Sequence, residues 1–513
     1  MLKKIRVAVA ILVFAFLTFG FVDFAGFVEN PMLQKIQFGP ALMSLSLVTL
    51  LVLAAVTFVF GRIYCSVICP LGIFQDFFNW LSKKFNKKKK YGFKADMPWL
   101  RWGVLAVLVV AWLFHLTVLV GLLEPYSAFG RIATELFKPV YVAGNNILAG
   151  FSERNGSYTF YYTILSKPTL MAVITAVLTF VVVGYMSFMY GRTWCNTICP
   201  VGTILGLFSR RQLMGVRIDD SKCNHCQACQ RKCKSYCIDS KNQKIDHSRC
   251  VDCFDCLDVC RQDAISYGPI NLLAKSKPAQ STEHIDTSKR EFLTSALVVA
   301  YYMVHRFFRD RNAAAAPSAV KAATGVQDAV KKITPMSPPG SGSHRNLLQH
   351  CTSCHLCISK CPSHVLKPAG LEYGLGGIMQ PVMKFDQGYC NYDCKLCSEI
   401  CPDGAIKPLT VEEKHHTQPG MVVFTMHECV VYKNETSCGA CAEHCPTLAL
   451  KMVPYKDGLT IPQTNTDLCV GCGGCEFICP VKAVRIHGHA EHKVAVEPVN
   501  DQVINTDNLD FGF

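Results

Sequence analysis

Cysteine spacing is the feature of this chain that most limits how it can fold. The 513 residues contain 29 cysteines, and most of them fall into six groups of four with short, repeated gaps. Thiols at such gaps are typical of metal ligands rather than of disulfides. Zinc and iron–sulfur clusters are the two alternatives, and complete four-cysteine groups favour [4Fe–4S] clusters.

Two of the groups lie between residues 211 and 268. Their spacing is that of bacterial two-cluster ferredoxins, in which the last cysteine of each group binds the other cluster. The predicted ligands are Cys223, Cys226, Cys229 and Cys260 for cluster one, and Cys250, Cys253, Cys256 and Cys233 for cluster two. Lys234 and Arg261 follow the two groups, where this pattern usually has proline. Cys237 has no partner by spacing and is predicted to be a free thiol.

Four further groups lie between residues 346 and 492, and each of them ends in Cys-Pro. They are Cys351, Cys354, Cys357 and Cys361; Cys390, Cys394, Cys397 and Cys401; Cys429, Cys438, Cys441 and Cys445; and Cys469, Cys472, Cys475 and Cys479. We call these groups A, B, C and D. They predict four more [4Fe–4S] clusters, which makes six in all, but the spacing does not say which groups pair.

Group A also contains an alternative signature. Cys351-Thr-Ser-Cys354-His355 matches the attachment motif of c-type haem. Haem would leave Cys357 and Cys361 without a role, so iron–sulfur ligation is favoured and no haem is expected.

The first 210 residues predict a transmembrane domain of four helices. Half of the chain is hydrophobic, and four apolar runs have the length of about 20 residues that a helix needs to cross a bilayer. The runs are Val7 to Val28, Ala41 to Phe60, Trp102 to Leu123 and Thr169 to Tyr190. No small-residue cleavage site follows the first run, which disfavours a cleaved signal peptide.

Basic residues predict the orientation of this domain. Lys3, Lys4 and Arg6 precede the first run, the sequence KKFNKKKK follows the second, and Arg210 and Arg211 follow the fourth. By the positive-inside rule both ends of the domain face the cytoplasm. These flanks also account for the densest part of the net charge of +14, so no nucleic-acid partner is expected.

The transmembrane domain contains a duplicated motif, FGRIYCSVICPLG at 60–72 and YGRTWCNTICPVG at 190–202. Its cysteines are Cys65, Cys69, Cys195 and Cys199. The spacing places each pair on one side of a helical turn. The four thiols are candidates for a further metal or cluster site or for redox dithiols, with simple packing as the alternative. Arg62 and Arg192 are candidates for stabilising thiolates, because a nearby positive charge lowers a thiol pKa.

The residues from 269 to 345 predict a linker, and those from 493 to 513 a C-terminal tail. Within the linker, residues 288–318 resemble a twin-arginine export leader in which lysine replaces the first arginine. The apolar part is short for a spanning helix, so a surface amphipathic segment is the alternative. Export would place the four-cluster domain in the periplasm and leave the first ferredoxin domain in the cytoplasm.

The paired Cys-x3-Cys-Pro motifs followed by a two-cluster ferredoxin resemble the NapH family of the wider NosR and NapH group. The leader-like stretch with four cysteine groups resembles NapG. The chain thus looks like a NapH–NapG fusion of a transmembrane α domain and α+β ferredoxin domains. The resemblance implies a quinol dehydrogenase of the bacterial inner membrane. Its partners would be membrane lipid, the quinone pool, and a periplasmic reductase such as nitrate reductase or a cytochrome.

Two ionisable residues are candidates for a quinone site. His115 lies inside the third apolar run and Glu124 at its outer end, and ionisable groups at membrane depth are often functional. A packing role for the histidine is an open alternative. Two other functions also stay open, a redox assembly factor that reduces a metal or thiols on a partner protein and an iron–sulfur sensor, which would need an output domain.

Overall fold

The computed structural model describes residues 1–513 except 24–31, 87–88, 158, 271–334 and 496–513. The described residues all belong to one compact unit, formed by Met1–Ile270 and Ile333–Phe513. The leader-like segment 288–318 and most of the predicted tail lie outside the described residues.

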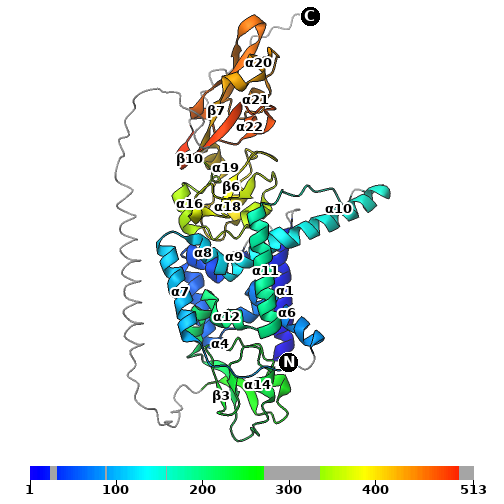
Figure 1. Ribbon diagram of the computed structural model, residues 1–513, viewed down its shortest axis with the longest axis vertical. Helices are drawn as coiled ribbons and strands as arrows, with labels where there is room; N and C mark the ends of the chain where they lie inside the picture. Colours follow the sequence, from blue (N-terminus) through cyan, green and yellow to red (C-terminus); the bar gives the residue numbers. More distant parts are fainter. Residues whose placement is uncertain (24–31, 87–88, 158, 271–334, 496–513) are drawn as a thin grey trace, which may run out of the picture. The chain divides into compact units, whose positions relative to one another are not determined.

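Residues 1–210 fold into helices, several of which begin at a proline, where the missing N–H costs no hydrogen bond (Figure 1). The helices are α1 (Leu2–Val22), α2 (Met32–Lys35), α3 (Phe38–Met43), α4 (Leu47–Phe60), α5 (Tyr64–Val67), α6 (Pro70–Phe85), α7 (Pro98–Leu113), α8 (Thr117–Leu123), α9 (Pro125–Ile132), the π-helix η1 (Ala133–Phe137), α10 (Lys138–Arg154), α11 (Leu170–Tyr190), α12 (Thr193–Thr197) and α13 (Pro200–Ser209).

Single long helices cover the fourth predicted membrane run and the first run as far as Val22. Among the described residues, α1 and α11, each of 21 residues, are long and apolar enough to cross a bilayer. The second and third runs are each split in two, by Leu45 between α3 and α4 and by His115 between α7 and α8. Both residues have left-handed backbones, with φ of 54° and 61°. A left-handed residue ends the helical hydrogen-bond ladder, which hydropathy alone does not reveal.

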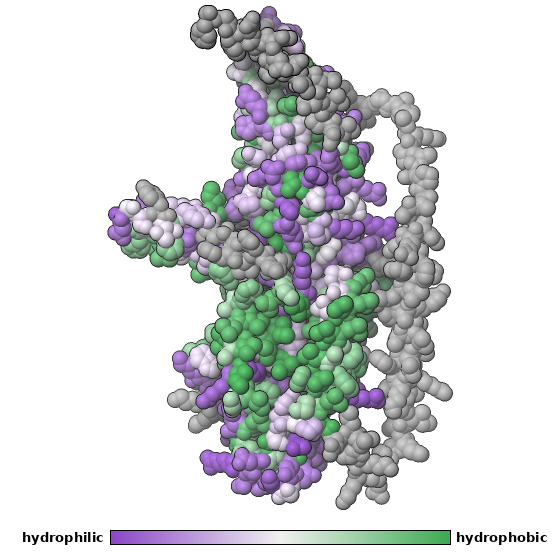
Figure 2. Space-filling model, turned by 180° about the vertical axis from the view of Figure 1, so that it is seen from behind, coloured by the Kyte–Doolittle hydropathy of each residue, from purple (hydrophilic) through white to green (hydrophobic). Residues whose placement is uncertain are grey.

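The helices pack through aromatic side chains, and α1, α6 and α11 run side by side (Figure 1). Phe180 of α11 lies 5.3 Å from Phe74 and 5.6 Å from Phe78 of α6, measured between ring centroids. The outward faces of α1, α4, α7 and α11 carry exposed apolar side chains, and Figure 2 shows a broad hydrophobic patch on one face. Apolar surface of this extent marks an interaction site, of which a lipid bilayer is one kind.

The first ferredoxin domain consists of short strands and helical turns. Its elements are β1 (Met214–Ile218), α14 (Ala228–Lys232), β2 (Ile238–Asp239), β3 (Lys244–Ile245), the 3₁₀ turn η2 (Leu257–Val259) and β4 (Ile265–Pro269). β1 pairs with β4, and β2 with β3, both antiparallel.

The second ferredoxin domain uses the same short units in a longer series. Its elements are α16 (His344–His350), α17 (Leu356–Lys360), β5 (Leu366–Pro368), η3 (Leu375–Gly377), β6 (Pro381–Met383), α18 (Leu396–Ile400), α19 (Val411–His416), β7 (Thr417–Phe424), η4 (Met426–Glu428), α20 (Val430–Asn434), α21 (Ala440–Glu443), β8 (Leu450–Pro454), η5 (Lys456–Gly458), β9 (Thr460–Thr464), η6 (Thr466–Leu468), α22 (Gly474–Ile478) and β10 (Val484–Val494). The antiparallel pairs are β5 with β6, β7 with β10, and β8 with β9.

Candidate iron–sulfur electron-transfer centres

The cysteines of the first ferredoxin domain gather in two cavities. One is lined by Cys223, Cys226, Cys229 and Cys260, and the other by Cys233, Cys250, Cys253 and Cys256. We call them the cluster-one site and the cluster-two site. Each combines three cysteines of one group with the last cysteine of the other, which is the crossed arrangement of two-cluster ferredoxins. The donor sets fit [4Fe–4S] clusters, and the ligand role of each cysteine stays a prediction.

Antiparallel strand pairs produce this crossing. Ile218 at the end of β1 faces Ile265 at the start of β4, so Cys223 just after β1 meets Cys260 just before β4. In the same way β2 and β3 bring together the cysteines before and after them, Cys233 and Cys250. Antiparallel strand pairs thus bring together ligands that are far apart in sequence.

The second domain repeats the device and so decides which groups pair. Cys361 lines a cavity with Cys390, Cys394 and Cys397 of group B, and Cys401 interacts electrostatically with the first three cysteines of group A. β5 and β6 join Cys361 to Cys390. Groups A and B are therefore one crossed pair.

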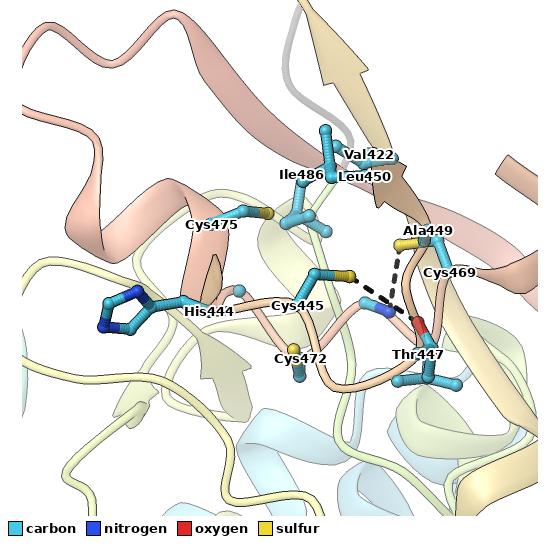
Figure 3. A pocket seen from close by; sticks show the side chains of 13 residues that line it. Val422, His444, Cys445, Thr447, Ala449, Leu450, Cys469, Cys472, Cys475 and Ile486 are labelled. Carbon is cyan, nitrogen blue, oxygen red and sulfur yellow. Dashed lines mark hydrogen bonds between the residues drawn. The ribbon is translucent and has the colours of Figure 1, made fainter. Parts of the chain in front are cut away.

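Groups C and D form the other crossed pair. Figure 3 shows Cys445 of group C beside Cys469, Cys472 and Cys475 of group D, around a cavity closed by apolar side chains. Its partner site joins Cys479 to the first three cysteines of group C, because Cys441 interacts electrostatically with Cys429, Cys438 and Cys479, and those three share one core. The pair β8–β9 joins Cys445 to Cys469, and the pair β7–β10 joins Cys429 to Cys479.

Left-handed residues recur between the cysteines of a group. They are His225 and Gln227, Asp252 and Phe254, and Ser353 and His355, with φ between 48° and 63°. Alternation of right- and left-handed residues curls the backbone so that successive N–H groups face inward, which suits an anionic cluster. Among the described residues, no three His, Cys, Asp or Glu side chains converge as a single metal ion would need. Thiolates of a [4Fe–4S] cluster bind different irons and lie farther apart.

The two crossed pairs of the second domain meet directly. The backbone N–H of Cys390 donates to the carbonyl oxygen of Cys472 over 2.9 Å. Lys414, which is buried, donates from Nζ to the carbonyl oxygens of Asn391 and Cys394. The site that contains Cys390 therefore lies beside the site that contains Cys472, and this backbone hydrogen bond joins them.

The duplicated motif folds in the same way in both copies. Gly61 and Gly191, with φ of 77° and 65°, end α4 and α11, and a short helix then leads to the proline that opens α6 or α13. All four cysteines of the motif are buried. Cys65, Cys69 and Cys199 share one hydrophobic core, and Cys195 interacts electrostatically with Cys65. Because a β-carbon at either glycine would collide with the ferredoxin domain, only glycine fits these positions.

The two motif arginines bind across the repeat. Arg192 donates from Nη1 to the carbonyl oxygen of Cys65 over 2.7 Å, and Arg62 donates from Nη2 to that of Cys195 over 3.2 Å. Both guanidinium groups lower the pKa of Cys195, as their positive charge predicts. Burial outweighs both guanidinium groups and raises the pKa of Cys195 above its usual value. A metal or cluster bound to Cys195 would oppose this effect of burial and hold its sulfur as a thiolate.

The arginines also hold the first ferredoxin domain against the motif. Arg62 Nη1 donates to the carbonyl oxygen of Ser248 over 2.9 Å, and the backbone N–H of Arg192 donates to that of Lys234 over 3.0 Å. Cys253 of the cluster-two site packs on the core that contains Cys65 and Cys69. The cluster-two site is therefore the part of the ferredoxin domain that adjoins the four buried thiols.

The second ferredoxin domain contacts a different part of the helices. Ser127 Oγ of α9 donates to Thr352 Oγ1 over 2.7 Å, and Arg131 Nη1 donates to the carbonyl oxygen of Ser353 over 3.2 Å. Cys354 packs in one core with the rings of Phe21, Tyr126 and Phe129. Of the sites in this domain, the one formed by the first three cysteines of group A and Cys401 therefore lies nearest the helices.

The two quinone-site candidates lie at opposite ends of α8. His115 is half-buried at the helix break that precedes α8. Glu124 is buried and caps α9 by accepting the backbone N–H of Ser127 at 2.5 Å. Its other oxygen, Oε1, has no hydrogen-bond partner in the described part of the chain. The structure therefore does not bring the two candidates together.

Both ring nitrogens of His355 are engaged by the protein. Nδ1 lies 3.2 Å from Glu135 Oε1 and Nε2 lies 3.1 Å from the carbonyl oxygen of Met379. Neither nitrogen is free to bind a haem iron. The histidine of the haem-like signature instead ties α17 to the π-helix η1.

Two features of the sites were missed at the level of the sequence. The Sγ atoms of Cys233 and Cys237 lie 3.5 Å apart, so Cys237 lines the cluster-two site rather than standing alone. Gln75 of α6 donates from Nε2 to Cys195 Sγ over 3.2 Å. The only sign of this role in the sequence is that Cys237 belongs to none of the four-cysteine groups. Nothing in the spacing points to Gln75.

Three protein-family models of 4Fe-4S proteins match parts of the chain. A 4Fe-4S binding domain matches residues 42–88 and 170–217, which contain the two copies of the duplicated motif. Two 4Fe-4S dicluster domains match residues 246–365 and 436–483. The second of these contains the last cysteines of group C and all of group D.

Curated relatives are ferredoxin-type proteins. The chain is 32% identical to ferredoxin-type protein NapF of Escherichia coli over 30% of its own length and 86% of NapF. It is 30% identical to the methylamine utilization ferredoxin-type protein MauM of Methylobacillus flagellatus, over 30% of the chain and 67% of MauM. It is 26% identical to ferredoxin-type protein NapH of Escherichia coli, over 40% of the chain and 61% of NapH. No solved structure matches it. The chain therefore belongs to the Nap-type family of ferredoxin-type iron–sulfur proteins, and it is an iron–sulfur electron-transfer protein.

Proposed function

We propose that this chain is a multi-pass protein of the bacterial inner membrane that oxidises quinol and passes the electrons to a periplasmic reductase or cytochrome. It joins a NapH-like half and a NapG-like half end to end. The six cysteine sites hold six [4Fe–4S] clusters, which supply one-electron storage. The acceptor would be a protein such as nitrate reductase.

One observation carries this proposal, the contacts at the two ends of α1. Lys3, at its start, forms ion pairs with Asp255 and Asp258 of the first ferredoxin domain, at 3.1 and 3.0 Å. Asp23, just after its end, pairs with Lys360 of the second domain at 2.8 Å. A 21-residue helix rises on the order of 30 Å, the thickness of the hydrocarbon core. This supports ferredoxin domains on opposite sides of the membrane, the first in the cytoplasm.

Glu124 is the better supported of the two quinone-site candidates. It is buried at the outer end of α8, and Oε1 has no hydrogen-bond partner among the described residues. Oxidation of a quinol releases two electrons and two protons, so a carboxylate beside the site has a proton to accept. Glu124 therefore takes one quinol proton and the other passes to water, while His115 shapes the break between α7 and α8.

Anaerobic mixing with a reduced quinol analogue tests the proposal. The visible absorbance of the oxidised clusters should bleach within the turnover time of the protein. Glu124→Gln should slow this bleaching roughly 100-fold or more, as loss of a general base does. Glu412→Gln, an exposed residue of α19, is the control. Wild-type protein that retains its clusters but shows no bleaching would reject quinol as the donor.

The assembly-factor alternative is disfavoured by burial. Cys65, Cys69, Cys195 and Cys199 are each at most 5% exposed, so they are out of reach of thiols on a partner. That alternative predicts that Cys65→Ser and Cys195→Ser abolish maturation of a partner and leave quinol oxidation intact. Our proposal predicts that both variants slow quinol oxidation, because the four thiols adjoin the cluster-two site, whose Cys253 packs on the same core.

A further inference from the structure

The residue that follows the first cysteine group, Lys234, is unusual in both kind and position. It occupies the place where two-cluster ferredoxins usually have proline. Its side chain is 5% exposed, and Nζ lies 2.8 Å from Asp76 of α6 and 3.6 Å from Asp255. Burying a lysine costs free energy that an ion pair does not always offset, so its presence needs a reason.

Lys234 belongs to a buried network of charges between the helices and the ferredoxin domain. Asp76 also binds Arg192 Nε at 2.8 Å and Arg6 Nη1 at 2.9 Å. Asp255 also binds Lys3 at 3.1 Å. Lys3 also pairs with Asp258 at 3.0 Å, so four cations face three carboxylates in this network. The network has a positive balance beside the cluster-two site.

The charge of Lys234 acts on the ligands of the cluster-two site. Lys234 adjoins Cys233 in the chain, and it interacts electrostatically with Cys253. Arg261 holds the equivalent place beside Cys260 of the cluster-one site, but its side chain is exposed, where water screens the charge. The two sites thus have the same ligands and different electrostatic surroundings.

We propose that Lys234 holds a positive charge beside the cluster-two site. This charge raises the reduction potential of the cluster there above that of the cluster in the cluster-one site. Reduction of a cluster adds one electron and no proton, so it adds one negative charge, which a buried cation stabilises. An electron that enters this domain then resides on the cluster of the cluster-two site, next to the buried thiols Cys65 and Cys195, rather than on the cluster at the exposed end of the domain. This inference rests on iron–sulfur clusters in the first ferredoxin domain and does not depend on quinol as the donor.

A redox titration followed by electron paramagnetic resonance tests it on the full-length protein. Lys234→Met should shift the midpoint potential of the cluster-two signal to a more negative value, and Lys234→Arg should restore it. Arg261→Met is the matched control and should leave both midpoints unchanged. Asp76→Asn removes a negative charge from the same network and should shift the cluster-two midpoint to a more positive value.

Iron and sulfide content must stay at the wild-type level in each variant that is compared. The proposal is overturned if Lys234→Met retains both clusters and leaves the cluster-two midpoint where it was, or if Arg261→Met shifts its own cluster as far. If Lys234→Met loses the cluster, the cluster-two midpoints of Lys234→Gln and Asp76→Asn decide instead. The proposal is rejected if either midpoint shifts in the direction opposite to the expected one, or if neither shifts.

Discussion

Arg192 donates a hydrogen bond to the carbonyl oxygen of Cys65 across 127 residues of sequence, and Arg62 donates the equivalent bond to the carbonyl oxygen of Cys195. Each copy of the duplicated motif therefore supplies the group that satisfies the other copy. The Gly-Arg pair that opens each motif also meets the first ferredoxin domain. One small motif thus joins the two helical hairpins and the domain that adjoins them.

Arg192→Met should strongly destabilise the protein. The side chain is fully buried, and its loss leaves Asp76 short of one partner and the Cys65 carbonyl without its donor. Breaking a buried ion pair costs about 3–5 kcal/mol. Denaturant unfolding in detergent measures this, with Arg211→Met, at an exposed site, as the control that should change stability by less than about 0.5 kcal/mol. A small effect at Arg192 would contradict the importance of the crossed bonds.

Gly191→Ala should loosen the first ferredoxin domain. The residue has φ of 65°, and an added β-carbon would lie 2.6 Å from the carbonyl oxygen of Lys234. The left-handed backbone alone costs an alanine roughly 1–2 kcal/mol. Faster proteolysis between α13 and β1 would report the loosening. Gly144→Ala in α10, where the new carbon meets nothing within 4 Å, should leave proteolysis unchanged.

Removal of the last cysteine of a group should abolish the cluster of the paired group. Cys401→Ser should eliminate the cluster bound by the first three cysteines of group A, because Cys401 interacts with those thiols. Cys445→Ser should instead affect group D. Iron content and electron paramagnetic resonance of the two variants should differ in which signal is lost. Loss of the group B signal in Cys401→Ser would show that the groups are not crossed.

The cluster-one site should be the first to react with an oxidant. Cys226 is the one exposed cysteine among all 29, which lie within the described part of the chain. Thiolate ligands are attacked in proportion to their accessibility. Timed exposure to ferricyanide should therefore remove the cluster-one signal before any other. Prior loss of the buried cluster-two signal would contradict the arrangement.

Acid should weaken the second ferredoxin domain through His492. Burial and the neighbouring His344 and His489 lower the pKa of His492 to about 4. Because the unfolded state then binds the proton more tightly, stability is lost as pH falls from about 6.5 towards 4. The loss is about 3 kcal/mol at most. Unfolding measured across this range should be flatter in His492→Gln, and an unchanged slope would reject the assignment.

Local spacing carried much of the information about this protein. The cysteine groups, the duplicated motif and the apolar segments of α1 and α11 are all legible in the chain, because ligand gaps and hydropathy are short-range properties. The spacing of the first ferredoxin domain also indicates that Cys260 joins Cys223, and the structure brings these two residues into one cavity. The assignment of iron to these sites stays a prediction.

Tertiary structure decided the relations that depend on distant residues. The pairing of group A with group B, and of group C with group D, follows from strand pairs that no spacing encodes. The partnership of Lys234 with Asp76 and the crossed arginine bonds need a folded interface, because their members are far apart in sequence. Hydropathy does not predict the helix breaks at Leu45 and His115, because it carries no information about backbone conformation. Sequence determined which residues are available for electron transfer, and packing determined which of them lie together.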